Sequence, residues 1–381
     1  MDVSSAVIRR LLVSRGVSST VDFHALLDAS RSPSHKLAIT LLSCWATEGH
    51  ALDASQRAEL DAYRDRADRY AGIWARLRVV APTAHLVKGP VIAAHYPVGV
   101  VRAAGDLDIV DPDPAELWQA AAMLAADGWW VAAFTVLPYP GGHDVLLSMQ
   151  QASSGPIADA YEVELRTPDV ATSLTRTPVR FDPADDVPVA SSIVALAAER
   201  FERRFASRDI LDLGVLSAEL TDAGRAALTQ ALTAARLWPA YQQLCRLLDR
   251  ADLPGRGPLP QDRPLIRRQR ISGPLHVLRT WSHPLRAAAL LAISTADVDR
   301  GRVADRFTRT LHERFGARRL LLAGVPLFGV PVDDHRTDAL RLVDRGHRLI
   351  ARTPVGTFLL TAGACPQEWL SDLATPAEAA T

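Results

Sequence analysis

The stretch that decides the fold spans residues 86–110 and reads LVKGPVIAAHYPVGVVRAAGDLDIV. An apolar run ends at Lys88-Gly89, a helix-sized apolar segment follows, and a second apolar run carries Asp106 and Asp108. Side chains two apart in a strand project from the same face, so these carboxylates lie side by side while the apolar residues beside them face the core. The stretch therefore predicts a strand, a turn, a helix and an acidic strand in succession.

These four parts have the chemistry of a nucleotide site. Two neighbouring carboxylates attract a divalent cation, and Mg²⁺ takes one or two carboxylates together with water and phosphate oxygens. At the turn, Gly89 lets the backbone approach a ligand closely, and the helix N-terminus offers amide groups to a phosphate. We therefore expect a site for Mg²⁺ and a nucleoside triphosphate around Lys88, Gly89, Asp106 and Asp108.

The first 80 residues carry leucines at helical spacing, which predicts that they are helical throughout. Asp53 with Gln56 three residues later is typical of a capping box, and the Ser-Pro pair at 32–33 predicts another helix start. Interleaved charges over residues 54–76, Arg66 among them, indicate an exposed helix face.

Between the acidic strand and residue 166, the chain alternates between helix and strand patterns. Asp111 and Asp113 border prolines, which is typical of turn or cap residues. The expected elements are a helix at 116–126 and strands at 129–136, 144–149 and 160–165, the last two paired as a hairpin. They form a compact α/β unit with a mixed sheet.

Beyond a linker at 178–188, helices are expected again, and strands close the chain. Helix patterns occupy 191–205, 209–220, 223–237, 240–248, 275–291 and 303–315. Strand-like runs occupy 319–322, 330–332 and 349–360, the last folded at 353–356.

Composition bounds the class of protein. At about 150 residues per domain, 381 residues predict two or three structural units. The 43 basic residues balance 43 acidic ones, which excludes a uniformly basic nucleic-acid coat. The first residues lack a leader pattern and no apolar run is long enough for a membrane span, so we expect a cytoplasmic protein without membrane contact. Lysine occurs only at Lys36 and Lys88, so 41 of the basic residues are arginine.

The motif as a whole resembles the signature of a bacterial family of nucleotidyltransferases, often encoded near natural-product genes. The resemblance covers about residues 20–250. It rests on the Lys-Gly turn at 86–89, Tyr96-Pro97, Arg102, the Gly-Asp-x-Asp strand at 105–110, Gly128-Trp129, His143, Val163 to Leu165 and the helix at 208–213.

The resemblance implies a third carboxylate from a later strand. Glu162 and Glu164 both qualify, since they share one strand face. Glu164 is favoured because it stands between two apolar residues at the position that matches the family's third acidic strand. Many nucleotidyltransferases carry Gly-Ser in the phosphate turn; here Lys88-Gly89 takes that place, and the Lys88 ammonium would act as a point charge in place of the serine.

The mechanism implied is Mg²⁺-dependent nucleotidyl transfer. Two Mg²⁺ ions would bridge Asp106, Asp108 and the triphosphate of an NTP, with ATP as the expected donor. Glu164 would take the proton of an acceptor hydroxyl on a small molecule or peptide, and would also ligate the second metal. The remaining residues expected at the nucleotide, beside Lys88 and Gly89, are Arg102, Gly105, His143 and Arg208. A structural histidine at a strand start and ion pairing on a helix surface are the alternatives for the last two.

The sequence thus predicts an α+β protein with four regions. These are a helical N-terminal region at 1–80, a nucleotidyltransferase core with a mixed sheet at 81–170, a helical domain at 188–315 and a C-terminal extension with strands at 316–381. The alternative function is a noncatalytic binding or scaffold protein that keeps this fold. Modification of nucleic-acid ends would rest only on the arginines between 263 and 279, which read more simply as a solvated surface, so nucleic acid is not expected as a partner.

Overall fold

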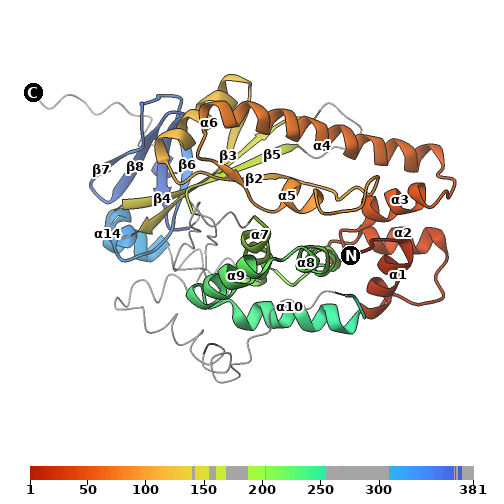
Figure 1. Ribbon diagram of the computed structural model, residues 1–381. Coiled ribbons are helices and arrows are strands. Elements are labelled where there is room, and N and C mark those ends of the chain that lie inside the picture. Colours follow the sequence, from red (N-terminus) through yellow and green to blue (C-terminus); the bar gives the residue numbers. More distant parts are fainter. Residues whose placement is uncertain are drawn as a thin grey trace, which may run out of the picture.

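The computed structural model describes residues 1–139, 142–153, 160–168, 188–201, 203–254, 269, 309–363, 365 and 368–370. Their strands form one nine-stranded mixed sheet in the order β1-β2-β5-β4-β3-β6-β9-β8-β7 (Figure 1). The strands are β1 His85–Leu86, β2 Leu107–Val110, β3 Trp130–Tyr139, β4 Gly142–Gln151, β5 Tyr161–Arg166, β6 Leu327–Asp333, β7 Arg341–Arg345, β8 Arg348–Thr353 and β9 Gly356–Thr361. The protein is therefore a mixed α/β fold, as the patterns predict.

Helices flank this sheet on both sides (Figure 1). Their bounds are α1 Ser5–Ser14, α2 Phe23–Arg31, α3 Ala38–Thr47, α4 Ala54–Val80, α5 Gly89–Ala93, α6 Pro114–Ala126, α7 Pro188–Ala198, α8 Ser207–Ala218, α9 Asp222–Ala234, α10 Trp238–Arg250 and α14 Ala317–Leu322. A 3₁₀ turn, η2 Glu199–Phe201, follows α7. No helix within these described ranges is long and apolar enough to cross a membrane.

Two predictions at helix starts are confirmed. Asp53 caps α4 and forms the expected box, because its carboxylate accepts from Gln56 N at 2.8 Å and the Gln56 side chain accepts from Asp53 N at 3.0 Å. Asp113 is the N-cap of α6. The start predicted at residues 32–33 is wrong: α3 begins only at Ala38. Lys36 has a φ of +55°, which interrupts any right-handed helix entering from the Ser-Pro pair.

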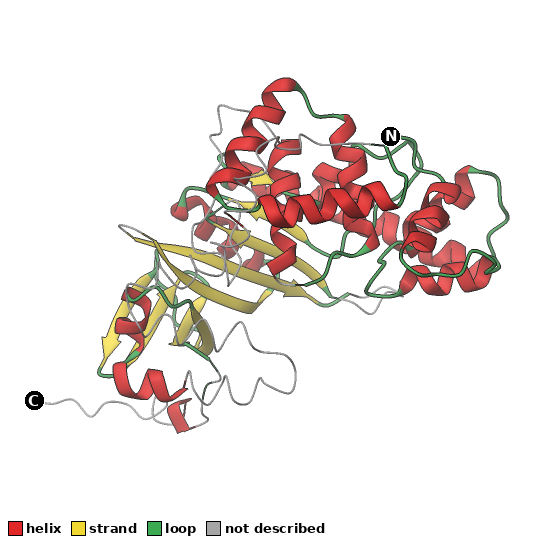
Figure 2. Ribbon diagram, turned by 90° about the horizontal axis from the view of Figure 1, so that it is seen from below, coloured by secondary structure: helices red, strands yellow, loops and turns green. Residues whose placement is uncertain are grey.

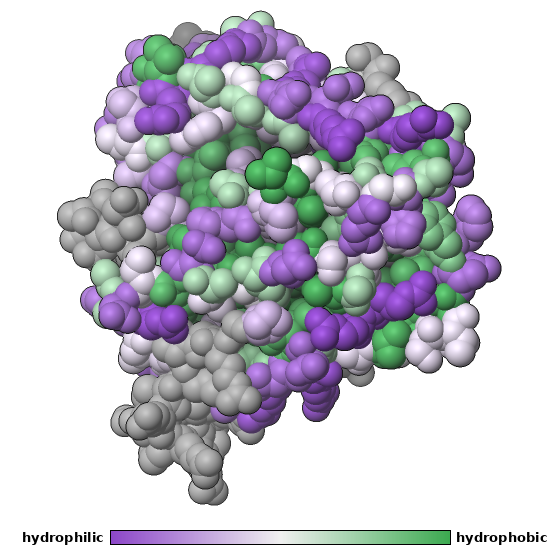
Figure 3. All heavy atoms as spheres, turned by 45° about the vertical axis from the view of Figure 1, so that its right-hand side comes forward, coloured by the Kyte–Doolittle hydropathy of each residue, from purple (hydrophilic) through white to green (hydrophobic). Residues whose placement is uncertain are grey.

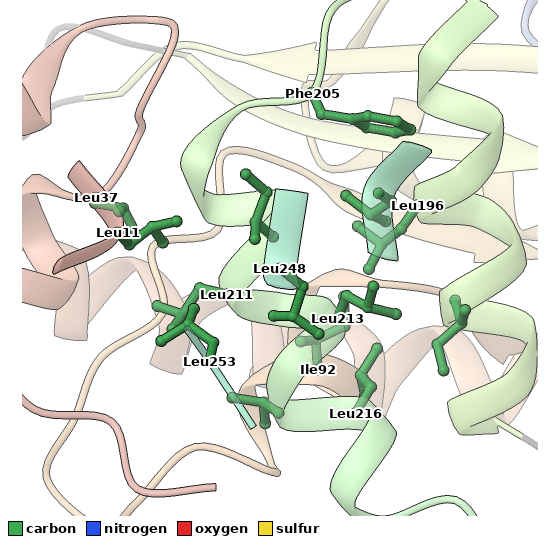
Figure 4. Packing of buried hydrophobic residues seen from close by; sticks show 14 of the residues in the cluster. Leu11, Leu37, Ile92, Leu196, Phe205, Leu211, Leu213, Leu216, Leu248 and Leu253 are labelled. Atoms are coloured by element: carbon green, nitrogen blue, oxygen red, sulfur yellow. The ribbon is translucent and has the colours of Figure 1, made fainter. Parts of the chain in front are cut away.

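Two hydrophobic cores lie on either side of the sheet. Leu107 and Ile109 of β2 join the core that α4 and α6 cover. Val110 belongs to the other core, which contains α1–α3, α5 and α7–α10. Figure 4 shows Ile92 of α5 among the leucines of α8 in this second core. Since Asp108 alternates with Leu107 and Ile109, it faces the second, helical side.

The prediction that residues 54–76 present an exposed helix face is wrong at Arg66. This side chain is buried at 4% exposure, and its guanidinium donates to the carbonyls of Gly105 at 2.8 Å and Ala160 at 2.6 Å. Carbonyl oxygens compensate the charge, which allows an arginine to point inward. Helix α4 thereby fixes the loop that leads into β2.

The C-terminal strands continue the central sheet, because β6 pairs with β3 in antiparallel register. The β8–β9 hairpin is confirmed, whereas β7 has no counterpart in the prediction. The strand predicted at 319–322 is wrong: these residues belong to α14, where Ala317, Leu320 and Leu321 follow helical spacing and are buried. Figure 2 shows the sheet extending past the helices α7–α10 toward this C-terminal part.

Predictions for the linker at 178–187, the helix at 275–291 and the arginines between 263 and 268 and between 270 and 279 lie outside the described residues. On the face of the molecule in Figure 3, hydrophilic side chains alternate with smaller hydrophobic areas.

Candidate functional site

The centre of the candidate site is the pairing of two neighbouring strands. β2 and β5 run parallel, and their register sets Asp108 directly opposite Glu164. The same register sets Leu107 opposite Val163 and Ile109 opposite Leu165 on the core side. The sheet thus brings the predicted third carboxylate next to the predicted acidic pair, on the face that looks toward the helical core.

Glu162 has a different environment from Glu164. Its carboxylate accepts from the Ser148 hydroxyl at 2.6 Å and from the Gln150 amide at 3.5 Å, both on β4. Of the two candidate glutamates, Glu164 is therefore the one opposite Asp108, while Glu162 is engaged by the next strand.

A cation from the same strand separates the two acids. Arg166 places Nη1 3.0 Å from Glu164 Oε1 and Nη2 3.9 Å from Asp108 Oδ1, with only 6% of its side chain exposed. The sequence analysis did not single out Arg166. Arg166 stands two residues after Glu164 in one strand, which puts both side chains on one face, so this spacing could have indicated that Arg166 belongs to the site.

The carboxylates remain only partly neutralised. Burial, opposed by Arg166 and reinforced by Asp108, raises the pKa of Glu164 to about 7. The pKa of Asp106 is also raised, first because the surrounding protein reduces the solvation of its carboxylate and then because of the charge of Asp108. Part of the residue is nevertheless accessible to solvent. Loss of solvation is the first cause of both shifts and repulsion between the carboxylates adds to it, so a bound cation would favour the ionised acids.

The turn at Lys88-Gly89 lies beside these acids. Lys88 has a φ of +60°, which is uncommon outside glycine, and its amide donates to the Ser192 hydroxyl of α7 at 3.3 Å. Gly89 also has a positive φ, and a Cβ built there would lie 3.7 Å from the Asp106 carbonyl oxygen. The turn is therefore held between the acidic strand and α7.

The Lys88 ammonium donates to Glu199 Oε1 at 2.6 Å. Burial would lower the pKa of Lys88, but Asp108 and Glu199 outweigh it and raise that pKa. Glu199 in turn lies 3.1 Å from Arg203 Nε, and Arg203 pairs with Asp209 of α8 at 2.7 Å. A chain of ion pairs thus connects the phosphate turn to η2 and α8.

Arg102 is engaged elsewhere. Its Nε and Nη2 donate to the two carboxylate oxygens of Asp212 at 2.9 and 2.7 Å, and the Tyr96 hydroxyl donates to the same carboxylate at 2.7 Å. Both partners of this ion pair are nearly inaccessible, at 5% and 0% side-chain exposure. In this structure Arg102 ties the loop before β2 to α8, and its charge also interacts with that of Asp106.

Gly105, Arg208 and His143 complete the predicted set. The Gly105 carbonyl is fixed by Arg66 and by the Tyr70 hydroxyl, each at 2.8 Å. Arg208 donates to the Ala103 carbonyl at 2.9 Å, and its charge acts to lower the pKa of Asp106, so it lies at the site.

His143 lies apart from the acids. It is exposed on β4, five positions before Ser148, which pairs with Glu164. At about 3.4 Å per residue this separation is about 17 Å. Burial and Arg318 of α14 lower the pKa of His143, which places it at the other end of the strand.

The second lysine of the sequence also approaches the site. Carbonyls of Ser34 and His35 accept from the amides of Ser207 and Arg208 at 3.0 Å, so the turn before Lys36 packs on the start of α8. Burial and the charges of Arg203 and Arg208 lower the pKa of Lys36. The sequence shows that lysine is scarce, but no local pattern indicates that both lysines lie close to the same chain of ion pairs.

The donor set suits Mg²⁺, which prefers hard carboxylate oxygens. Asp106, Asp108 and Glu164 supply these, since the strand register sets Asp108 opposite Glu164 and Asp106 directly precedes β2. Within the described ranges, however, no three His, Cys, Asp or Glu side chains already have metal-holding spacing. Since Arg166 pairs with Glu164 and lies 3.9 Å from Asp108, a metal ion shared by these two carboxylates would compete with its guanidinium.

Comparisons with known proteins find no relative: no protein-family model, no curated protein and no solved structure matches the chain.

Proposed function

We propose that the chain is a Mg²⁺-dependent nucleotidyltransferase with the nucleotidyltransferase fold. It would transfer a nucleoside monophosphate, AMP if ATP is the donor, to a hydroxyl of a small molecule or peptide and release pyrophosphate. The observation that carries the proposal is the parallel register that sets Asp108 opposite Glu164, beside the Lys88-Gly89 turn.

Asp106, Asp108 and Glu164 would hold the metal, which when bound would offset the charge that develops on the α-phosphate and on pyrophosphate. Besides Arg166, which pairs with Glu164, the cations near these acids include Lys88 and Arg208, and these two would contact the β and γ phosphates. Their charges would fix the triphosphate beside the carboxylates.

Glu164 would act as the general base. A carboxylate whose pKa is about 7 exists in both protonation states at neutral pH, which suits proton transfer. The acceptor oxygen would form a bond to the α-phosphorus while the bond from that phosphorus to the bridging oxygen of pyrophosphate breaks. The hydroxyl proton would pass to Glu164.

The two ion pairs at the site define a resting state. Lys88 is bound by Glu199, and Arg166 lies between Asp108 and Glu164. Binding of the nucleotide with its metal would exchange these internal partners for phosphate oxygens and metal. Because the internal pairs compensate buried charges, the empty site is stable without ligands.

The test is product analysis by mass spectrometry after incubation with each NTP, Mg²⁺ and a pool of hydroxyl acceptors. We expect nucleotidylated product and pyrophosphate from the wild-type chain and none from Asp106→Asn with Asp108→Asn. Asp113→Asn is the matched control, since asparagine also serves as an N-cap and the change is chemically identical. Equal NTP turnover and Mg²⁺-dependent nucleotide binding in the double variant would refute the assignment.

One observation favours the second candidate, a noncatalytic binding protein that keeps this fold. Arg166 provides a built-in cation where the metal would lie. If the wild-type chain binds NTP equally well with Mg²⁺ and with EDTA, and forms no product, the binding role replaces the catalytic one.

A further inference from the structure

The outer face of the last hairpin gathers arginines in a register that places like charges opposite one another. In the β7–β8 pair, Arg341 lies opposite Arg352, and Arg345 lies opposite Arg348. Alternation along the strands puts all four on one face, around the apolar pair Val343 and Ile350. Like charges directly opposite in an antiparallel pair destabilise the sheet, so this arrangement calls for another stabilising partner.

A hollow lies on the same face. Its volume is about 240 Å³, below the roughly 300–1,000 Å³ of pockets for drug-sized ligands, so it suits a small ligand. It is lined by Val332, Asp333, His335, Val343, Arg345, Ile350, Arg352 and Thr357. Val343 and Ile350 contribute apolar surface to this lining, and Arg345 and Arg352 contribute two guanidinium groups.

Among the described ion pairs, no carboxylate neutralises the two arginines that line the hollow, Arg345 and Arg352. Asp344 points to the opposite face of β7 and pairs with Arg318 of α14. Among the described ion pairs none involves Arg345 or Arg352, whereas the surface arginines Arg31 and Arg309 each have carboxylate partners.

The one acid in the lining is Asp333. Its Oδ1 accepts from the His335 amide at 2.8 Å, and no described ion pair joins it to an arginine. The Thr357 hydroxyl donates to the His335 carbonyl at 2.9 Å, so it turns an oxygen lone pair, not its proton, toward other groups. The side-chain hydrogen-bond donors left to a ligand here are therefore those of Arg345 and Arg352, together with the His335 imidazole.

We propose that this hollow binds the phosphate group of a small phosphate monoester. Arg345 and Arg352 would donate to the phosphate oxygens, since the guanidinium fork matches phosphate geometry, and the carbon part would rest on Val343 and Ile350. In the sheet order, seven inter-strand steps separate β7 from β2. At about 4.8 Å per step this is roughly 34 Å along the sheet, so the site is distinct from the acidic one and does not rest on the function proposed for it.

The experiment is calorimetric titration of inorganic phosphate, at ionic strength held constant with chloride, into the Lys88→Ala chain. That background removes the phosphate turn from the titration. We expect one phosphate bound per chain, and at least tenfold weaker binding after Arg345→Gln with Arg352→Gln is added. Arg57→Gln with Arg64→Gln, two exposed arginines of α4, is the charge-matched control and should change the affinity less than twofold.

Two further arms define the ligand class. Phenyl phosphate should bind more tightly than inorganic phosphate, because its ring covers Val343 and Ile350, and benzoate should bind more weakly than phenyl phosphate. The Arg345/Arg352 variant should unfold at the same temperature as its parent or higher, since it relieves repulsion. Unchanged phosphate affinity in that variant, or a preference for benzoate, would overturn the proposal.

Discussion

The two ends of the single sheet each gather like charges but treat them differently. At the β2–β5 end, Asp108 and Glu164 lie beside cations of the same chain, among them Lys88 and Arg166. At the β7–β8 end, arginines face one another and the described acids pair elsewhere. As we propose, the first end would bind its ligands by exchanging internal ion pairs, whereas the second would need no exchange because no described ion pair engages Arg345 or Arg352.

Burial accounts for the difference. Asp108 and Arg166 have side-chain exposures of 8% and 6%, and a charge so far from water must have a partner within the fold. Arg341 and Arg345 are exposed, so water compensates them at small cost. A buried site therefore needs counter-ions from the chain itself, whereas water compensates the charges of an exposed site as long as no ligand is bound.

The largest expected effect is on the chemistry at the acidic end. Glu164→Gln should lower kcat about 10²–10⁴-fold, the typical contribution of a general base. Glu162→Gln, on the same strand but bonded to Ser148, should leave kcat within a few fold. Steady-state kinetics of both variants distinguish the two glutamates; a larger loss in Glu162→Gln would reverse their assignment.

The next effect is on stability and compares a buried ion pair with an exposed one. Arg102→Met removes one partner of a buried, hydrogen-bonded pair and should cost about 3–5 kcal/mol in the free energy of unfolding. Arg318→Met breaks an exposed pair with Asp344 and should cost less than about 1 kcal/mol. Chemical denaturation measures both, and equal losses would show that burial does not separate the ends.

Lys88 and Glu199 test the exchange of partners. Lys88→Ala should weaken NTP binding about tenfold or more, with little effect on acceptor binding, because the ammonium is a point charge for phosphate. Glu199→Gln should tighten NTP binding a few fold, since the competing carboxylate is removed. Fluorescence titration with a labelled nucleotide follows both, and weaker binding in Glu199→Gln would show that Glu199 positions Lys88 for the nucleotide.

The smallest effect is the pH dependence of the metal-free chain. The pKa of Glu164 is about 7 in the folded state and about 4.3 in an unfolded chain, so between these values only the folded state keeps the proton. The contribution of Glu164 to stability is complete below the lower value and is lost as the pH rises through 7. The slope should stay under about 1.4 kcal/mol per pH unit, because the side chain is 32% exposed to screening water.

Denaturation in EDTA between pH 5.5 and 8 measures this slope. Subtracting the Glu164→Gln curve isolates the contribution of Glu164, because the histidines titrate alike in both chains. A difference that stays constant or increases with pH over this range would contradict the raised pKa.

Local patterns in the sequence predicted those features that depend on neighbouring residues. The Asp53 capping box and the β8–β9 hairpin follow from local sequence patterns alone. The position of Glu164 opposite Asp108 needed more, because strand pairing at long range leaves no local trace. It was expected from a family resemblance and is seen in the register.

What the sequence did not reveal depends on tertiary contacts. Arg66 reads as a surface charge until the carbonyls of Gly105 and Ala160 meet it. Arg166 reads as a strand residue until β2 lies beside β5. The pairing of β6 with β3, which joins the C-terminal strands to the core sheet, brings together residues nearly 200 positions apart, and no periodicity encodes it.

Because lysine is scarce, an amine-reactive reagent can modify very few side chains of this protein. Lys36 is exposed, and its lowered pKa increases the share of free, nucleophilic amine. Lys88 is held as an ammonium ion by Glu199, which blocks acylation. A mild acylating dye should therefore modify one lysine side chain, next to α8, and labelling of Lys88 should begin only when Glu199 releases it.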